Sequence, residues 1–168
     1  MKLLGEVSTV KQMELTAGFL ELLSQAPDLL DFQPPRLCNL QHLVLDMWST
    51  RGCLQAISYV LRIYPNVSYL SLRCDMKSNS ENVDDDWETG LSSRGMLSHL
   101  KYVQIERVEG CDAELKLLSF LLNNATDLEE LSIYFISDEV TQVEQFKDKL
   151  RGVPTASLSI RLVFQTQF

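Results

Sequence analysis

The chain has 168 residues, a formal net charge of −8 at pH 7 and a mean hydropathy of −0.04. This length, with 45% apolar residues, is enough for one domain with a sizeable core. The acidic balance argues against nucleic acids and anionic membrane surfaces as partners, because both attract basic proteins. No apolar run is long enough to span a bilayer and the first residues do not resemble a secretory signal, so we expect a cytoplasmic or nuclear protein.

The cysteine and histidine pattern predicts no metal site. None of the four cysteines stands in a Cys-x-x-Cys clip, and the chain has only two histidines. We interpret the thiols as reduced, which fits the same compartments, and we expect neither a metal nor another cofactor. The cysteines are Cys38, Cys53, Cys74 and Cys111.

The most informative pattern is a phrase of three apolar residues, at positions i, i+3 and i+5, that recurs five times. Its central residues lie 30, 27, 33 and 28 positions apart. Such a period is typical of repeat arrays, in which each unit buries its apolar face against its neighbours. The copies are Val10-Met13-Leu15, Leu40-Leu43-Leu45, Val67-Leu70-Leu72, Leu100-Val103-Ile105 and Leu128-Leu131-Ile133, preceded three places earlier by Val7, Leu37, Tyr64, Leu97 and Ala125.

Each copy of the phrase predicts a short strand followed by a helix. In residues 41–46, Leu43 and Leu45 alternate with polar residues and Val44, as in a strand with one buried face. Apolar residues with helical spacing follow the predicted strands, and the strand-like alternation of apolar residues returns near the C-terminal end of the chain. The predicted helices cover residues 18–23 with 28–30, 53–63, 113–122 and 140–150, and the predicted sixth strand covers residues 157–164.

The starts of two helices and one surface loop can also be predicted. Asp112 is a plausible N-cap for the helix at 113–122, and Asp138 or Thr141 for the helix at 140–150. Residues 77–90 are polar, acidic and poor in apolar residues, so we expect a surface loop there in place of a helix.

Strand–helix units of about 30 residues predict parallel strands joined by crossover helices. The expected fold is therefore α/β, a right-handed βα solenoid with a parallel sheet on one face and helices on the other, and its recurring phrase resembles that of leucine-rich repeats. Residues 1–95 would form irregular leucine-rich repeats with the acidic loop at 77–90, and residues 96–168 would continue the same solenoid.

The positions between the buried apolar residues form the opposite face of the predicted sheet. This face mixes aromatic residues with both signs of charge, a composition suited to protein interfaces. Three tyrosines in successive repeats, Tyr69, Tyr102 and Tyr134, suggest an aromatic ladder. The candidate partner-binding residues are His42, Asp46, Tyr69, Ser71, Arg73, Tyr102, Gln104, Glu106, Glu130 and Tyr134.

The sequence carries no recognised catalytic signature. It has no phosphate-binding glycine loop, no zinc-protease motif and no nucleophile elbow, so we do not expect an enzyme and name no catalytic residue. His42 and Cys74 lie near strand ends of adjacent repeats and are the remaining pair to consider. A buried polar pocket among Arg73, Tyr69 and His42 would instead favour a small-molecule sensor.

Residues 97–135 carry the sharpest resemblance to a known family. A strand is followed by Gly110, by Glu114-Leu115 at the start of a helix, and by Leu122-Asn123-Asn124-Ala125 before Leu128-Glu129 and a second strand. This arrangement resembles the FBD domain at the C-terminus of plant F-box/LRR proteins. Residues 153–157 fit the ending of that domain, and residues 7–45 look like the upstream repeats of the family.

The resemblance implies a protein-binding role, in which the repeats recruit the target of an SCF-type ubiquitin ligase and an F-box recruits a Skp-type adaptor. No F-box with its usual LP-containing motif is found in this sequence, so we do not expect this chain to bind the adaptor. We therefore predict a protein–protein interaction module with an unidentified target. The alternatives are a fragment of a small-molecule-sensing repeat receptor and a truncated remnant without independent function.

Overall fold

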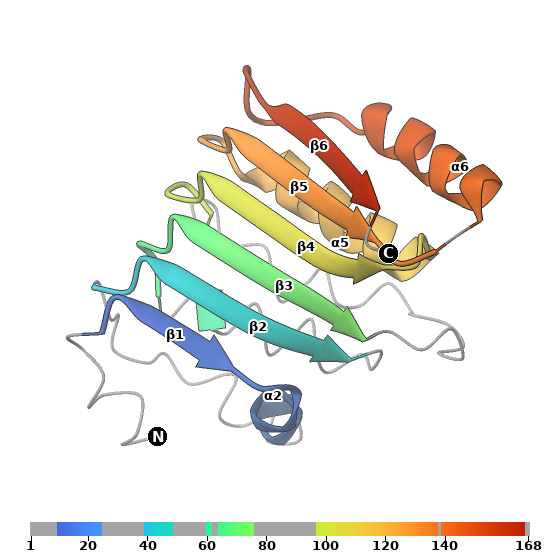
Figure 1. The fold of residues 1–168 in the computed structure, drawn as a ribbon. Coiled ribbons are helices and arrows are strands. Elements are labelled where there is room, and N and C mark those ends of the chain that lie inside the picture. The colour runs from blue at the N-terminus through green and yellow to red at the C-terminus, as the bar shows by residue number, and fades with distance from the viewer. Residues whose placement is uncertain are drawn as a thin grey trace.

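The computed structural model describes residues 10–24, 39–48, 60–61, 64–75, 97–137 and 139–166. Within these residues, six strands form one parallel sheet, and their order in space follows their order in the chain (Figure 1). The α/β class is thus confirmed. The strands are β1 (Gln12–Leu15), β2 (His42–Trp48), β3 (Tyr69–Asp75), β4 (Tyr102–Val108), β5 (Glu130–Phe135) and β6 (Arg161–Thr166), and the described helices are α2 (Ala17–Ser24), α5 (Asp112–Asn124) and α6 (Val140–Arg151).

The repeated phrase sets the register of the strands. Its two strand residues lie opposite their counterparts in the next strand, which produces two apolar rows across the sheet. Both rows are buried on the side that α5 and α6 occupy, except where they reach β6 (Figure 1). The rows are Leu43, Leu70, Val103, Leu131 and Leu162, and Leu45, Leu72, Ile105, Ile133 and Phe164.

The position three places before the phrase is also buried where the structure describes it. Tyr64, Leu97 and Ala125 are exposed by 3% or less and join the core. The Tyr64 hydroxyl has the Met13 sulfur as its acceptor at 3.5 Å, and burial raises the pKa of this tyrosine to about 12. The predicted apolar residues at Val7 and Leu37 lie outside the described residues.

Each strand from β2 to β5 begins with the same backbone contact. The carbonyl of the residue before one strand accepts two N–H groups of the following repeat, and this pattern recurs four times. The repeats therefore share this backbone contact at the start of the strand as well as the strand itself. The accepting carbonyls belong to Lys11, Gln41, Ser68 and Lys101.

Helix α5 begins one residue earlier than predicted and has a different cap. The N-cap is Cys111 and not Asp112, and the fully buried Glu114 carboxylate accepts the N–H groups of Glu109, Gly110 and Cys111 at 3.1, 2.7 and 3.0 Å. Burial raises the pKa of Glu114 more than these three donors lower it. Gly110 has a φ of 93°, which confirms that the exit from β4 needs a residue without a side chain.

The start of α6 also corrects a sequence-based prediction, and α5 ends without a left-handed residue. Asn124 is the last residue of α5, but the cap residue Ala125 is extended, so asparagine does not supply a left-handed turn. Its amide instead donates to the carbonyl of Phe120 at 2.8 Å. The N-cap of α6 is Glu139, and Thr141 lies inside the helix; Asp138 is outside the described residues.

Helix α6 covers the last strands with an apolar stripe. Val143, Phe146 and Leu150 are buried, and the Phe146 ring meets the edge of Phe135 at a centroid distance of 5.7 Å. Lys147 follows Phe146 on the same helix, and its ammonium lies 5.5 Å from the centre of the Phe164 ring.

The sixth strand is present but begins at Arg161, four residues later than predicted. Leu158 is fully exposed, so the expected alternation does not start there. The preceding segment bonds elsewhere: the Ala156 N–H donates to the Leu122 carbonyl, and the Ser157 hydroxyl donates to the Leu128 carbonyl at 2.6 Å. These contacts hold residues 156–157 against the end of α5 and the approach to β5.

Three predicted features lie mostly or wholly outside the described residues. Of the predicted helix at 53–63, only residues 60–61 are described, and both are helical and buried. The predicted acidic loop at 77–90 and the segment at 28–30 are not described.

The substitution Leu131→Asp is expected to unfold the described C-terminal strands. It places a charge at a position that is 0% exposed, and we expect a loss of about 4 kcal/mol or more in the free energy of unfolding. Urea denaturation followed by circular dichroism measures this loss. Leu158→Asp is the control, because Leu158 is fully exposed; equal stability of the two variants would contradict the register.

Glu114→Ala is expected to lower the free energy of unfolding by about 2–4 kcal/mol, because three buried N–H groups lose their acceptor. The control Glu144→Ala, on the exposed side of α6, should cost less than about 0.5 kcal/mol.

The substitution Glu114→Gln adds a pH test of the same cap. The pKa of Glu114 is higher in the folded chain than its ordinary value, so the wild-type carboxyl loses stabilisation as the pH rises through the unfolded and then the folded pKa. Glutamine does not titrate. The cost of Glu114→Gln in urea denaturation should therefore be larger at pH 4 than at pH 7, and the opposite trend would contradict this assignment.

Candidate functional site

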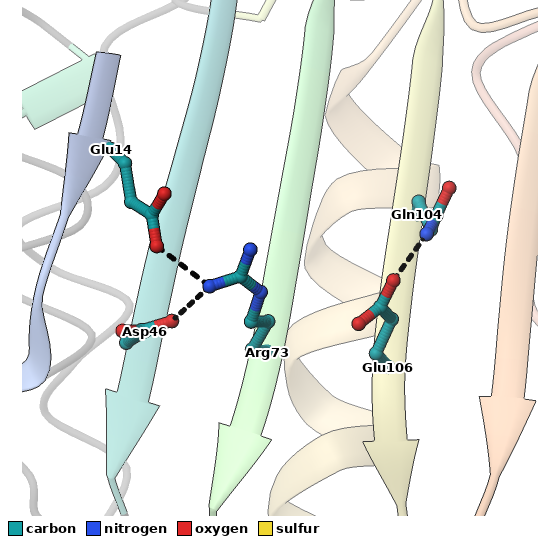
Figure 2. A network of polar contacts seen from close by, with 5 residues as sticks. All are labelled: Glu14, Asp46, Arg73, Gln104 and Glu106. Atoms are coloured by element: carbon teal, nitrogen blue, oxygen red, sulfur yellow. Dashed lines mark hydrogen bonds and ion pairs between the residues drawn. The ribbon is translucent and has the colours of Figure 1, made fainter.

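The side of the sheet opposite α5 and α6 carries the polar positions of the strands. We call it the polar face, and none of the described helices lies on it (Figure 1). Figure 2 shows five of its side chains in front of β1–β4, with α5 behind the sheet. All ten candidate residues lie at polar-face positions, together with Glu14, Val44 and Ser132: His42, Asp46, Tyr69, Ser71, Arg73, Tyr102, Gln104, Glu106, Glu130 and Tyr134.

Three aromatic side chains form a row across the start of β2, β3 and β4. His42 lies opposite Tyr69, and Tyr69 lies opposite Tyr102. The ring centroids are 4.2 Å apart in the first pair and 6.4 Å in the second. Tyr102 is 41% exposed and is among the exposed large side chains of the described residues. We call these three residues the aromatic row.

The predicted ladder of three tyrosines is wrong in its last member. Tyr102 lies opposite Glu130 on β5, whereas Tyr134 lies opposite Gln165 on β6. The reason is their place in the phrase: Tyr69 and Tyr102 precede the first buried strand residue, and Tyr134 follows the second. His42 has the same place as Tyr69 and takes the third position of the row.

A second row crosses the other end of the polar face and is charged. Asp46, Arg73 and Glu106 lie opposite one another on β2, β3 and β4. The Arg73 guanidinium contacts Glu14 Oε1 at 2.7 Å and Asp46 Oδ1 at 3.4 Å (Figure 2). The hydrogen bond and charge of Glu14 raise the pKa of Arg73, and the charges of Asp46 and Glu106 add to this effect. We call Asp46, Arg73 and Glu106 the charged row.

A chain of hydrogen bonds connects the two rows. The Tyr69 hydroxyl donates to Gln104 Oε1 at 2.7 Å, and Gln104 Nε2 donates to Glu106 Oε1 at 2.5 Å (Figure 2). Burial raises the pKa of Tyr69, and the nearby Tyr134, Glu106 and Glu130 raise it further. The phenol therefore remains a donor at neutral pH and fixes the orientation of the Gln104 amide.

The middle of the polar face consists of small side chains on β2, β3 and β5, with Gln104 between them on β4. Val44, Ser71 and Ser132 are exposed by 7%, 7% and 8%, although no described helix covers them. Val44 and Ser71 lie on adjacent strands between the aromatic and charged rows. Ser132 lies two strands further on, on β5. The members of the aromatic and charged rows are intermediate or exposed, so these rows are the more accessible part of the face.

Sequence reasoning missed two groups that extend the polar face. Arg161 on β6 binds Glu130, and together with Ser132 it lowers the pKa of that carboxyl. Glu129 accepts the Tyr102 hydroxyl at 2.8 Å, which raises the pKa of the phenol. Arg161 could have been found, because it stands directly before Leu162 as Glu130 stands before Leu131.

The chemical alternatives considered from the sequence find no geometric support in the described residues. His42 and Cys74 lie at opposite ends of β2 and β3, about 16 Å apart along the strands. Arg73 turns toward Glu14, and Tyr69 turns toward Gln104, so Arg73, Tyr69 and His42 do not enclose a buried pocket. In the part of the chain that the structure describes, no group of three metal-ligating side chains is found, and no helix is long and apolar enough to cross a membrane.

Comparison with known proteins finds an FBD match and two similar proteins. Residues 94–133, which contain β4, α5 and most of β5, match the FBD family. The chain is 30% identical over 139 residues to "Putative F-box/FBD/LRR-repeat protein At5g44950" of Arabidopsis thaliana, which is 82% of this chain and 30% of the relative.

A second Arabidopsis thaliana protein, "F-box/FBD/LRR-repeat protein At5g53840", is 28% identical over 118 residues, or 67% of this chain and 26% of the relative. The chain is a relative of the F-box/FBD/LRR-repeat proteins. It spans less than a third of the length of these two curated relatives. No solved structure matches it.

Arg73→Ala is expected to change the charge of the polar face without unfolding the chain. The side chains of Arg73, Glu14 and Asp46 are 42%, 52% and 31% exposed, and ion pairs this exposed contribute less than about 1 kcal/mol each. Thermal denaturation of the variant should give a cooperative transition close to that of the wild type. A loss of that transition would show that the charged row is a structural core element.

Proposed function

We propose that this chain is a leucine-rich-repeat-type solenoid that binds a target protein through its polar face. The role corresponds to the substrate-recognition region of an SCF-type ubiquitin ligase F-box protein. The observation that carries the proposal is the polar face itself: an accessible sheet surface on which aromatic and charged side chains are held in rows by a regular ladder.

Three features support this proposal. Strand order equals chain order across all six described strands, which is the arrangement of a repeat array. The rows rest on a rigid sheet, so binding would order few additional groups. The names of the related proteins combine F-box, FBD and LRR-repeat, which agrees with a region devoted to interaction.

The proposal assigns target recognition, and not adaptor binding, to the polar face. Tyrosines with an exposed ring and a bonded hydroxyl are suited to the centre of a protein interface, because they offer apolar area and a polar group together. Tyr102 has this form: its ring is exposed, and its hydroxyl is held by Glu129. The Tyr69 ring lies beside it at 6.4 Å between centroids.

Affinity purification from plant extract tests the proposal. The tagged chain is compared with the variant Tyr69→Ala/Tyr102→Ala and with the control Val140→Ala/Leu158→Ala, which also removes exposed apolar side chains but leaves the polar face intact. Circular dichroism first establishes that all three fold.

We expect a protein that the wild type and the control retain and that the tyrosine variant loses by tenfold or more, the loss of about 1.4 kcal/mol. Equal retention by both variants would place the contact elsewhere. Recovery of no protein by the wild type would overturn the proposal in favour of a chain without independent function.

A further inference from the structure

The polar face carries more negative than positive charge. Among the strand residues on it whose side chains the structure describes, two guanidinium groups face four carboxylates. At its edge Lys101 pairs with Glu129 at 3.8 Å, and this pair adds no net charge. Each guanidinium is already engaged, so the excess charge is not neutralised within the sheet. The cations are Arg73 and Arg161, and the carboxylates are Glu14, Asp46, Glu106 and Glu130.

The excess is concentrated around the charged row. Arg73 bonds to Glu14 and Asp46 together, and Glu106 is close enough to raise the pKa of the same guanidinium. One positive charge therefore faces three negative charges across four neighbouring strands. In the described structure, the Glu106 carboxylate has an amide donor from Gln104 and no cation within salt-bridge distance.

Glu106 is held in place on this face. Gln104 Nε2 donates to its Oε1, and Gln104 is itself fixed by the Tyr69 hydroxyl. A carboxylate oriented in this way loses little side-chain freedom when a cation binds, which favours binding. The aromatic row lies at the other end of the polar face and is connected to Glu106 through Gln104, and the faces of tyrosine rings attract ammonium and guanidinium groups.

We propose that the occupant of the polar face is a lysine- and arginine-rich segment of the target protein. This inference rests on the proposed function and adds the chemistry of the partner. Basic side chains would pair with Glu106 at one end of the charged row and with Asp46 and the nearby Glu14 at the other. The aliphatic parts of these side chains would lie along Tyr69 and Tyr102. The net charge of −8 on the whole chain steers a basic segment toward the protein.

The test measures binding of fluorescein-labelled nonapeptides by fluorescence anisotropy. In the first peptide lysine and arginine alternate with glycine, and in the second glutamine replaces every basic residue. The full chain is used as wild type and as Glu106→Gln, Arg73→Ala and Glu144→Gln, at about 0.05 M and about 0.3 M NaCl. Glu144→Gln removes the same charge from exposed α6 and is the matched control.

The proposal predicts changes of opposite sign on one face. Glu106→Gln should weaken binding of the basic peptide roughly three- to fivefold, the range for one partly exposed pair. Arg73→Ala should strengthen it, because a competing cation is removed, and Glu144→Gln should leave it unchanged. The glutamine peptide should bind more weakly than the basic one, and the difference should shrink at high salt.

Three outcomes would overturn this inference. They are equal binding of the two peptides, equal effects of Glu106→Gln and Glu144→Gln, and displacement of the basic peptide by spermidine at equal total charge, which would show only a counterion effect. If the inference fails while target capture still depends on Tyr69 and Tyr102, the proposed function stands with a partner of different chemistry. If that capture fails as well, both are wrong.

Discussion

Burial of two apolar residues in each strand from β2 to β5 holds the sheet in one register. The pairs Leu43 and Leu45, Leu70 and Leu72, and their counterparts on β4 and β5 are almost completely buried. A slip of one residue would move each pair into solvent and carry charged residues into the core. Because all strands are parallel and share this register, a residue directly before the first buried position lies beside its counterpart in the next repeat.

The polar face is a consequence of that constraint. Strands far apart in sequence lie side by side at a spacing of about 4.8 Å, so the long Arg73 side chain reaches across β2 to Glu14 although 59 positions separate them. The same ladder holds His42, Tyr69 and Tyr102 in a row. Solvent reduces the strength of each exposed pair, and the rigidity of the sheet rather than any single contact keeps the surface in one arrangement.

The strands, the buried positions and the identity of the face could be predicted from sequence because they follow a period-two pattern. The wrong predictions concern a helix cap and the start of a strand, and both depend on local contacts that a periodic sequence pattern does not show. Cys111 is the cap of α5 because the Glu114 carboxylate reaches back to three N–H groups, and β6 starts late because Ser157 bonds to the Leu128 carbonyl. The tyrosine ladder is wrong because it rests on the presence of a tyrosine in successive repeats, whereas the place within the phrase decides the row.

The aromatic resonances of the chain offer the most direct test that the polar face is the binding surface. In NMR spectra with the basic peptide or a captured target, the account predicts shifts of His42, Tyr69 and Tyr102, which share one side of the sheet. Phe135, Phe146 and Phe164, which pack on the side of α6, should not move. Shifts confined to these phenylalanines, with the aromatic row unchanged, would contradict the account.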